Sequence, residues 1–143
     1  MFDWFDMHSW SHGLTPMNDG KDQESTSEEI NLVYGMYLWG KTIGNLALQQ
    51  LGATMLTLTA KSTQNYFLLK TGNPNHHPDF VKNHVTGIFF QNKVHYTTWF
   101  GSDPVYIHGI QMMPLSPAVT MTRTVDYCSQ EWNEILRHVK MEE

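Results

Sequence analysis

The sequence predicts a mainly α-helical fold with one small β-hairpin, and it predicts that this fold is incomplete as a domain. Two long segments, residues 26–42 and 45–71, carry apolar residues at the three-and-four spacing of a helix with one buried face. Residues 85–99 are enriched in β-branched and aromatic side chains, and residues 125–139 return to helical spacing. These few elements offer more apolar surface than they can bury against one another, so we expect further packing partners.

The composition is that of a folded domain, and it excludes several kinds of partner. The 143 residues are about enough for one domain, with 41% hydrophobic and 13% aromatic side chains. The chain has only 9 Lys and Arg residues against 14 Asp and Glu, without a basic run, so we expect no nucleic acid partner. No apolar stretch approaches the ~18 residues of a membrane span. The single cysteine, Cys128, excludes an internal disulfide and leaves the compartment open.

The amino-terminal segment, residues 1–23, is expected to be irregular because glycines and a proline interrupt any periodicity. A helix is expected over residues 26–42, since overlapping capping-box patterns begin at Ser25 and Thr26, each with a glutamate three residues later. Gly44 then marks the end of this helix. Its apolar positions are Ile30, Val33, Tyr34, Tyr37 and Leu38.

A second helix is expected to begin after Asn45, which can cap it, and to continue for nearly seven turns until Gly72 and Pro74 stop it. The short connection between the two helices makes them antiparallel. The stripe of the second helix consists of Leu48, Leu51, Met55, Leu58, Ser62, Tyr66 and Leu69. We expect four large side chains of the two helices in the core rather than in a cofactor site, namely Tyr34, Tyr37, Met55 and Tyr66.

The carboxyl-terminal half is expected to contain a hairpin and a final helix separated by loops. Residues 72–78 form a loop, and the strands of the hairpin flank Gln91 and Asn92. A mobile loop with three prolines is expected over residues 101–118. The final helix is expected to bury a stripe made of Val125, Cys128, Trp132, Ile135, Leu136 and Val139.

Three carboxylates, Glu24, Glu28 and Glu29, lie at the start of the first helix and are the first candidates for chemistry. Residues four apart on a helix have Cβ atoms ~5–6 Å apart, so Glu24 and Glu28 would share an edge if the helix reaches back to Glu24. Clustered acids raise one another's pKa and helix amino-terminal amides lower it, which suits a catalytic acid or base. The simpler interpretation, that acidic residues favour the first helical turn, is the better one on spacing alone.

An aromatic and histidine-rich segment, WFDMHSWSH at residues 4–12, lies just upstream of these carboxylates. Carboxylates do acid and base work and flat rings stack on sugar faces, so the combination suits a polysaccharide hydrolase. Two carboxylates on one helical edge would approach a glycosidic bond from the same side, so we expect the second catalytic acid elsewhere in the fold. Among the tryptophans, Trp10 and Trp99 lie near loops and are preferred for stacking on glucose rings.

A metal site is conceivable in the same segment, because His8 and His12 are four residues apart with Asp3 and Asp6 nearby. The segment lacks the helical pattern that would place both rings on one face. Hydrogen bonds to sugar hydroxyls, or structural contacts, are therefore the favoured roles of these histidines.

Several separated blocks of the chain resemble glycoside hydrolase family 81, a family of endo-β-1,3-glucanases (laminarinases). The blocks occur in the expected order, and the resemblance covers roughly residues 3–132. They are HSW (8–10), GL (13–14), DGKDQESTSE (19–28), YG (34–35), LWG (38–40), NKVHYTTWFG (92–101) and YIHGIQMMP (106–114).

The resemblance implies a partial (α/α)6 toroid, with residues 1–143 as a carboxyl-terminal fragment of the catalytic domain. Full-length members carry a β-sandwich domain and a connecting region before it. The implied reaction is inverting hydrolysis of β-1,3-glucan, in which one carboxylate activates water and a carboxylic acid on the other side protonates the leaving oxygen. By motif position, Glu24 is the general base and Glu28 a second essential carboxylate, although the two roles could be reversed.

The resemblance also implies a set of substrate contacts and a partner, a β-1,3-glucan polysaccharide or oligosaccharide. No cofactor and no metal ion are expected. The cellular location stays open, and it would be extracellular or the cell wall if a signal peptide lies upstream. The implied substrate-binding residues are His8, Trp10, His12, Asp19, Lys21, Trp99 and His108.

The chain departs from the family in one respect, the catalytic acid. That residue is an aspartate in an upstream block that these 143 residues lack, and Asp3 and Asp6 lie too close to the His-Ser-Trp motif to replace it. We therefore expect the fragment alone to be inactive and its intact parent to be the glucanase. An alternative is a non-catalytic β-glucan-binding or recognition protein. A stand-alone helical interaction module would make the multi-block resemblance an accident.

Overall fold

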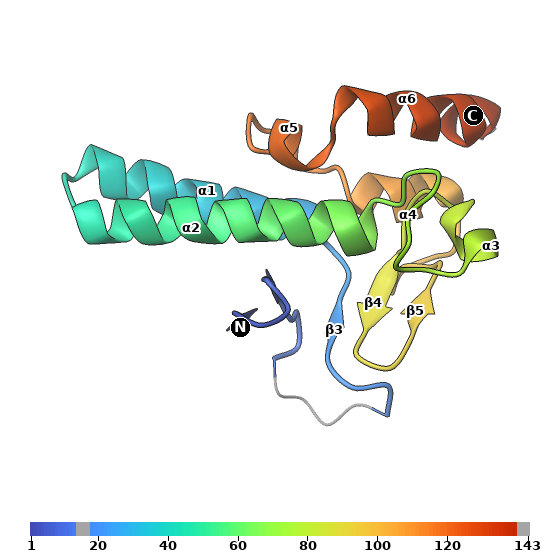
Figure 1. The fold of residues 1–143 in the computed structure, drawn as a ribbon, viewed down its shortest axis with the longest axis horizontal. Helices are drawn as coiled ribbons and strands as arrows, with labels where there is room; N and C mark the ends of the chain where they lie inside the picture. Colours follow the sequence, from blue (N-terminus) through green and yellow to red (C-terminus); the bar gives the residue numbers. More distant parts are fainter. Residues whose placement is uncertain (14–17, 140–143) are drawn as a thin grey trace.

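The computed structural model describes residues 1–13 and 18–139, and it confirms a mainly helical chain with small antiparallel sheets (Figure 1). Two long helices lie side by side along the long axis of the molecule, and the remaining elements gather toward one end of this pair. The Leu14 of the GL block, and the proline expected to break residues 1–23, lie outside the described residues.

The two long helices form the predicted antiparallel hairpin. Helix α1 (Thr26–Thr42) begins where the Ser25 hydroxyl accepts the backbone N–H of its third residue, as a helix cap does. Helix α2 (Leu46–Ser62) begins after Asn45, whose side-chain oxygen accepts the N–H of Leu48 at 3.0 Å. Gly44 connects the helices with a φ of +68°, a conformation that glycine adopts without steric cost.

Close packing of the two helix backbones depends on Gly40 and Gly52. A Cβ at Gly40 would lie 2.4 Å from the backbone nitrogen of Gln49, and one at Gly52 would lie 2.5 Å from that of Tyr37. The buried face of α2 is therefore rotated from the predicted stripe, and Leu51 is exposed.

The main hydrophobic core consists of Ile30, Val33, Met55, Leu56, Ala60, Ala118 and Val119, with Tyr34 only partly buried against it.

The second helix ends earlier than predicted. After α2 the chain forms a single π-helical turn (Thr63–Phe67) and then becomes extended at Leu68. The reason is tertiary pairing with a segment that precedes the hairpin: the N–H of Leu69 donates to the carbonyl of His84 at 2.8 Å, and the N–H of Thr86 donates to that of Phe67 at 3.0 Å. These hydrogen bonds replace those of a continued helix. The apolar periodicity could not indicate this, because the partner segment is distant in the sequence.

The predicted hairpin is present, and it is one part of a three-stranded sheet. Strands β4 (Ile88–Phe90) and β5 (Val94–His95) pair antiparallel, and β3 (Asp22–Gln23) pairs with the other side of β4. Strands β1 (Phe2–Asp3) and β2 (His8–Ser9) form a second sheet. The expectation of an irregular start was thus partly wrong, because β1, β2 and β3 lie within residues 1–23, and the pairing of β3 with β4 ties the start of α1 to the hairpin.

The segment expected to be a mobile loop, residues 101–118, contains a helix. Helix α4 (Pro104–Ile110) begins with the Asp103 side chain accepting the N–H of Val105 at 2.8 Å, and Pro104 occupies its first turn. An Asp-Pro pair can mark the start of a helix. The expectation of a loop treated the three prolines only as helix breakers. Two further one-turn helices are α3 (Pro78–Val81) and α5 (Val119–Thr122).

The final helix, α6 (Val125–Glu134), is followed by a 3-10 turn (Leu136–His138). The helix was predicted, but the expected stripe was only partly right: Cys128 packs against the core, whereas Val125 is exposed. Trp132, expected in the core, is 57% exposed, and the buried face instead carries Tyr127 and Glu131.

Several apolar side chains of the long helices and the last helix face outward, which agrees with the expectation that these elements bury only part of their apolar surface. No helix within residues 1–13 and 18–139 is long and apolar enough to cross a membrane. Exposed apolar residues on these helices are Leu32, Leu38, Trp39, Leu46, Leu51, Val125 and Trp132.

Candidate active site

Glu24 lies in the short connection between β3 and the N-cap of α1, and not on the helix itself. Glu24 and Glu28 would share one helical edge only if the helix reached back to Glu24, and that condition is not met because the helix begins at Thr26. The Glu24 carboxylate is half-buried, and its Oε1 accepts the backbone N–H of Trp99 at 2.7 Å. This bond joins the start of α1 to the segment that follows β5.

The pKa of Glu24 is raised. Partial burial, which penalises the charged form, is the largest cause. The Trp99 N–H and the His12 ring act in the lowering direction, whereas the carboxylates of Glu28 and Asp22 raise the pKa further. A raised carboxyl pKa near a cluster of acids is the property that suits a general base or acid.

Glu28 and Glu29, adjacent in the first turn of α1, have opposite environments. Glu28 is exposed, and its negative charge raises the pKa of Glu24. Glu29 is buried, where burial raises its pKa, and its Oε1 accepts the backbone N–H of Ser9 at 2.5 Å. Glu29 thus holds β2 against the helix and is not available to a substrate.

A buried aspartate that sequence reasoning missed lies next to Glu24. Asp22 is completely buried in β3, and its Oδ2 is 2.7 Å from Nδ1 of the exposed His12. The His12 ring in turn lies edge-on to the Trp99 ring, with centroids 6.1 Å apart. The position of Asp22, two residues before Glu24 in the same motif, was the available signal. His12, Asp22, Glu24 and Trp99 therefore form one cluster.

The two tryptophans preferred for sugar stacking have different fates. Trp99 is 52% exposed and contacts Phe90 edge to face, so its ring is available to a ligand. Trp10 is only 2% exposed, with its indole N–H donating to Asp3 at 3.3 Å and the Lys21 ammonium 5.1 Å from its ring centroid. The structure does not support sugar stacking by Trp10, which is a core residue.

The remaining substrate-contact candidates are mostly engaged within the fold. His8 is 2% exposed among aromatic rings, and burial lowers its pKa. His108 is fully buried, 2.7 Å from Glu131 and 3.0 Å from the Tyr96 hydroxyl. Direct sugar contact by His8 and His108 therefore does not fit their placement, because a sugar could not reach either ring.

Lys21 and Asp19 are the other two candidates on the β3 side of the molecule. The Lys21 ammonium bonds Asp3 at 3.1 Å and is mostly covered. Asp19 is half-exposed and pairs with Lys93 at 2.7 Å, which links the start of β3 to the hairpin turn. Of the two, Asp19 is the more accessible.

No group of three or more metal-ligating side chains occurs within the described part of the chain. The conceivable site at His8 and His12 is not formed, because the two rings have different surroundings. The His8 ring packs against Trp10 and Phe67, whereas the His12 ring pairs with Asp22.

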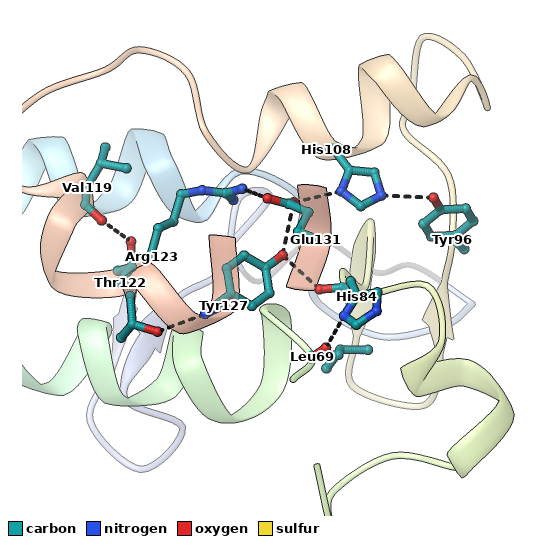
Figure 2. A network of polar contacts seen from close by, with 10 residues as sticks. Leu69, His84, Tyr96, His108, Val119, Thr122, Arg123, Tyr127 and Glu131 are labelled. Atoms are coloured by element: carbon teal, nitrogen blue, oxygen red, sulfur yellow. Dashed lines mark hydrogen bonds and ion pairs between the residues drawn. The ribbon is translucent and has the colours of Figure 1, made fainter. Parts of the chain in front are cut away.

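A buried polar network is centred on α6 (Figure 2). The Glu131 carboxylate is buried at its centre and accepts from the Arg123 guanidinium, from His108 and from the Tyr127 hydroxyl, the last at 3.0 Å. The Tyr127 hydroxyl also lies 2.8 Å from the carbonyl of His84. The network thus joins α4, α6 and the segment before β4.

Comparison with known proteins gives these features a family context. Residues 1–143 match the model of the Glycosyl hydrolase family 81 C-terminal domain. The chain is 46% identical over 131 residues to a glucan endo-1,3-beta-D-glucosidase of Arthroderma benhamiae, covering 92% of this chain and 14% of that protein. It is 41% identical over 138 residues to glucan endo-1,3-beta-D-glucosidase 2 of Saccharomyces cerevisiae, covering 96% of this chain and 18% of that protein.

A solved structure of glycoside hydrolase family 81 from Clostridium thermocellum has the same fold over this region. The TM-score is 0.81 at 26% sequence identity, covering 96% of this chain and 19% of that chain. The chain thus spans less than a fifth of the length of each of these relatives.

Proposed function

Because this chain belongs to glycoside hydrolase family 81, we propose that it is the carboxyl-terminal part of the catalytic domain of an endo-β-1,3-glucanase. We call the longer protein the full-length glucanase. The observation that carries the proposal is the placement of Glu24, a half-buried carboxylate with a raised pKa beside the exposed ring of Trp99. The names of the fungal relatives, both hydrolases of 1,3-β-glucan, favour an enzyme over a glucan-binding protein.

The rest of the catalytic domain would complete the fold as an (α/α)6 toroid. The exposed apolar side chains of α1 and α2 support this proposal, because further helices would bury them. The catalytic acid would come from that missing part. The chain alone is therefore inactive in this account.

In the proposed reaction, Glu24 takes a proton from water while the water oxygen bonds to the anomeric carbon of the sugar. The glycosidic bond breaks at the same carbon, and the upstream aspartic acid gives its proton to the leaving oxygen. The two carboxyl groups of an inverting enzyme lie ~6.5–9.5 Å apart to leave room for this water. Glu28 orients the water or tunes Glu24, and Trp99 stacks on a sugar ring.

The pH dependence of kcat/KM should reveal the raised pKa of Glu24. A general base must be ionised, so kcat/KM falls as the pH falls through the Glu24 pKa. We call this fall of kcat/KM at low pH the acid limb. Because burial raises the pKa of Glu24, the midpoint of the acid limb should lie at a higher pH than the ordinary pKa of a glutamate. Laminarin hydrolysis by the full-length glucanase, measured from about pH 3 to pH 8, tests this. A midpoint of the acid limb at or below the ordinary pKa of a glutamate would mean that the general base does not have the raised pKa of Glu24.

Replacing Trp99 with alanine should weaken binding of β-1,3-gluco-oligosaccharides by ~1–2 kcal/mol, which is about 5–30-fold in Kd. The backbone N–H that holds Glu24 remains in this variant, so the loss would come from the ring. Calorimetric titration of the full-length glucanase with Glu24→Gln as background measures binding without turnover.

Phe100→Ala is the matched control, because Phe100 is the next residue, is also exposed, and packs on Tyr106 with ring centroids 5.7 Å apart. Its Kd should stay unchanged. Equal Kd values for Trp99→Ala and the parent would return Trp99 to a structural role.

A further inference from the structure

We propose that Gln111 is a positioning residue for the general base, and that its side-chain amide fixes the backbone of Glu24 at the junction between β3 and α1. The inference rests on the proposed function, because it assigns a partner to the residue that acts as base there. Gln111 is 2% exposed and is the C-cap of α4. Sequence reasoning did not select it.

The Gln111 amide uses its full hydrogen-bonding capacity, which is two donors and two acceptor lone pairs. Its Nε2 donates to the carbonyl of Glu24 and to the carbonyl of Gly87, the latter at 2.9 Å. Its Oε1 accepts the backbone N–H of Thr26 at 3.1 Å and the hydroxyl of the same residue at 2.6 Å. Only a neutral amide can satisfy two carbonyls on one side and two donors on the other.

The junction needs such support because Glu24 belongs to no regular element. Strand β3 is two residues long and ends at Gln23, and α1 begins two residues after Glu24. Gln111 contacts the residue itself and the first residue of the helix, so it fixes the backbone on both sides of Ser25. Trp99 holds the carboxylate and Gln111 holds the main chain, and together they set the direction of the Glu24 side chain.

A second set of bonds fastens α4 to the same place. The hydroxyls of Ser25 and Ser27 donate to the carbonyl of Ile110 at 3.2 and 2.8 Å. These bonds would keep the end of α4 against α1 after loss of the Gln111 amide. The expected consequence of that loss is local movement of Glu24, and not separation of the two helices.

The test replaces Gln111 with methionine, which has a similar length and makes none of the four bonds, in the full-length glucanase. We expect kcat on laminarin to fall about 10–100-fold with KM within about twofold, because misplacing a catalytic group by about 1 Å has effects of this size. We also expect the acid limb of kcat/KM to move to lower pH, because a loosened Glu24 carboxylate becomes hydrated. Loss of folded protein alone would lower kcat without moving that limb.

Gln64→Met is the matched control. The Gln64 amide also donates to a backbone carbonyl, that of Met121 at 2.7 Å, but it is exposed, and its bond joins the π-helical turn to α5 rather than to the β3–α1 junction. Its kinetics should equal those of the parent. Thr26→Val is the second variant if Gln111→Met does not fold. It removes the hydroxyl that contacts Oε1, and the same shift of the acid limb is expected with a smaller loss of kcat.

Three results would overturn the inference. A folded Gln111→Met variant with the kcat and acid limb of the parent would do so, as would a lower kcat with an unmoved limb. Where only Thr26→Val folds, a limb equal to that of the parent would overturn it too. If the parent does not hydrolyse laminarin, or Glu24→Gln keeps the full rate, the proposed function fails first and the inference falls with it. These outcomes are separate measurements and so are distinguishable.

Discussion

Replacing Glu24 with glutamine in the full-length glucanase should abolish laminarin hydrolysis and leave the affinity for glucan largely intact. Glutamine has the same shape and can no longer accept a proton from the attacking water, so a loss of at least about 10²–10⁴-fold in kcat is expected for a general base. The side-chain oxygen can still accept the Trp99 N–H, which keeps the junction in place. Release of reducing ends measures kcat, and calorimetric titration measures the Kd of an oligosaccharide.

Glu134→Gln serves as the control for this experiment, because Glu134 is an exposed carboxylate of α6 whose partner is His84 and not a residue of the cluster. Its kcat should equal that of the parent. Parent-like rates for Glu24→Gln would move the base elsewhere, and Glu28 would be the next candidate.

Replacing Glu131 with alanine should destabilise the fold by ~3–5 kcal/mol, the range found when one partner of a buried ion pair is removed. The guanidinium of Arg123 would keep its charge in a buried site without its counter-charge, and one of its terminal nitrogens, Nη1, already has no hydrogen-bond partner within the described residues. His108 and Tyr127 would each lose an acceptor as well. The shift in the urea unfolding midpoint of the full-length glucanase measures the effect.

Glu134→Gln is again the matched control, since Glu134 lies on the same helix and also pairs with a histidine, His84, at 2.9 Å. Its side chain is 55% exposed, so solvent screens the pair and a change within about 1 kcal/mol is expected. Equal midpoint shifts for the two variants would mean that the burial of Glu131 does not increase the loss of stability.

The features that the sequence predicted correctly depend on neighbouring residues. The helix hairpin follows from two caps and a glycine turn, and all of these are local signals at Ser25, Asn45 and Gly44. The end of α2 was misjudged because a distant segment, residues 84–86, takes over the backbone hydrogen bonds there. Apolar periodicity carries no information about such a partner.

The candidate site shows the same division. The resemblance of the DGKDQESTSE motif to family 81 indicated Glu24 and Glu28. The exposure of Trp99 agrees with a stacking role. The burial of Trp10 and His108 was not predictable from the sequence. The residue type alone does not tell whether a histidine or tryptophan contacts a sugar at the surface or a carboxylate inside the fold. Gln111 was missed since its partner Glu24 is 87 positions away in the chain.

The most direct test of the central claim, that Glu24 is the general base, is azide rescue of Glu24→Ala in the full-length glucanase. Azide needs no deprotonation, so it can attack the anomeric carbon where the activated water would, while the upstream acid still protonates the leaving oxygen. If Glu24 is the base, azide restores turnover of laminari-oligosaccharides and yields an α-glucosyl azide, identified by its anomeric NMR signal. If azide fails to rescue Glu24→Ala but rescues Glu28→Ala with the same α-product, the base is Glu28 and the central claim is wrong.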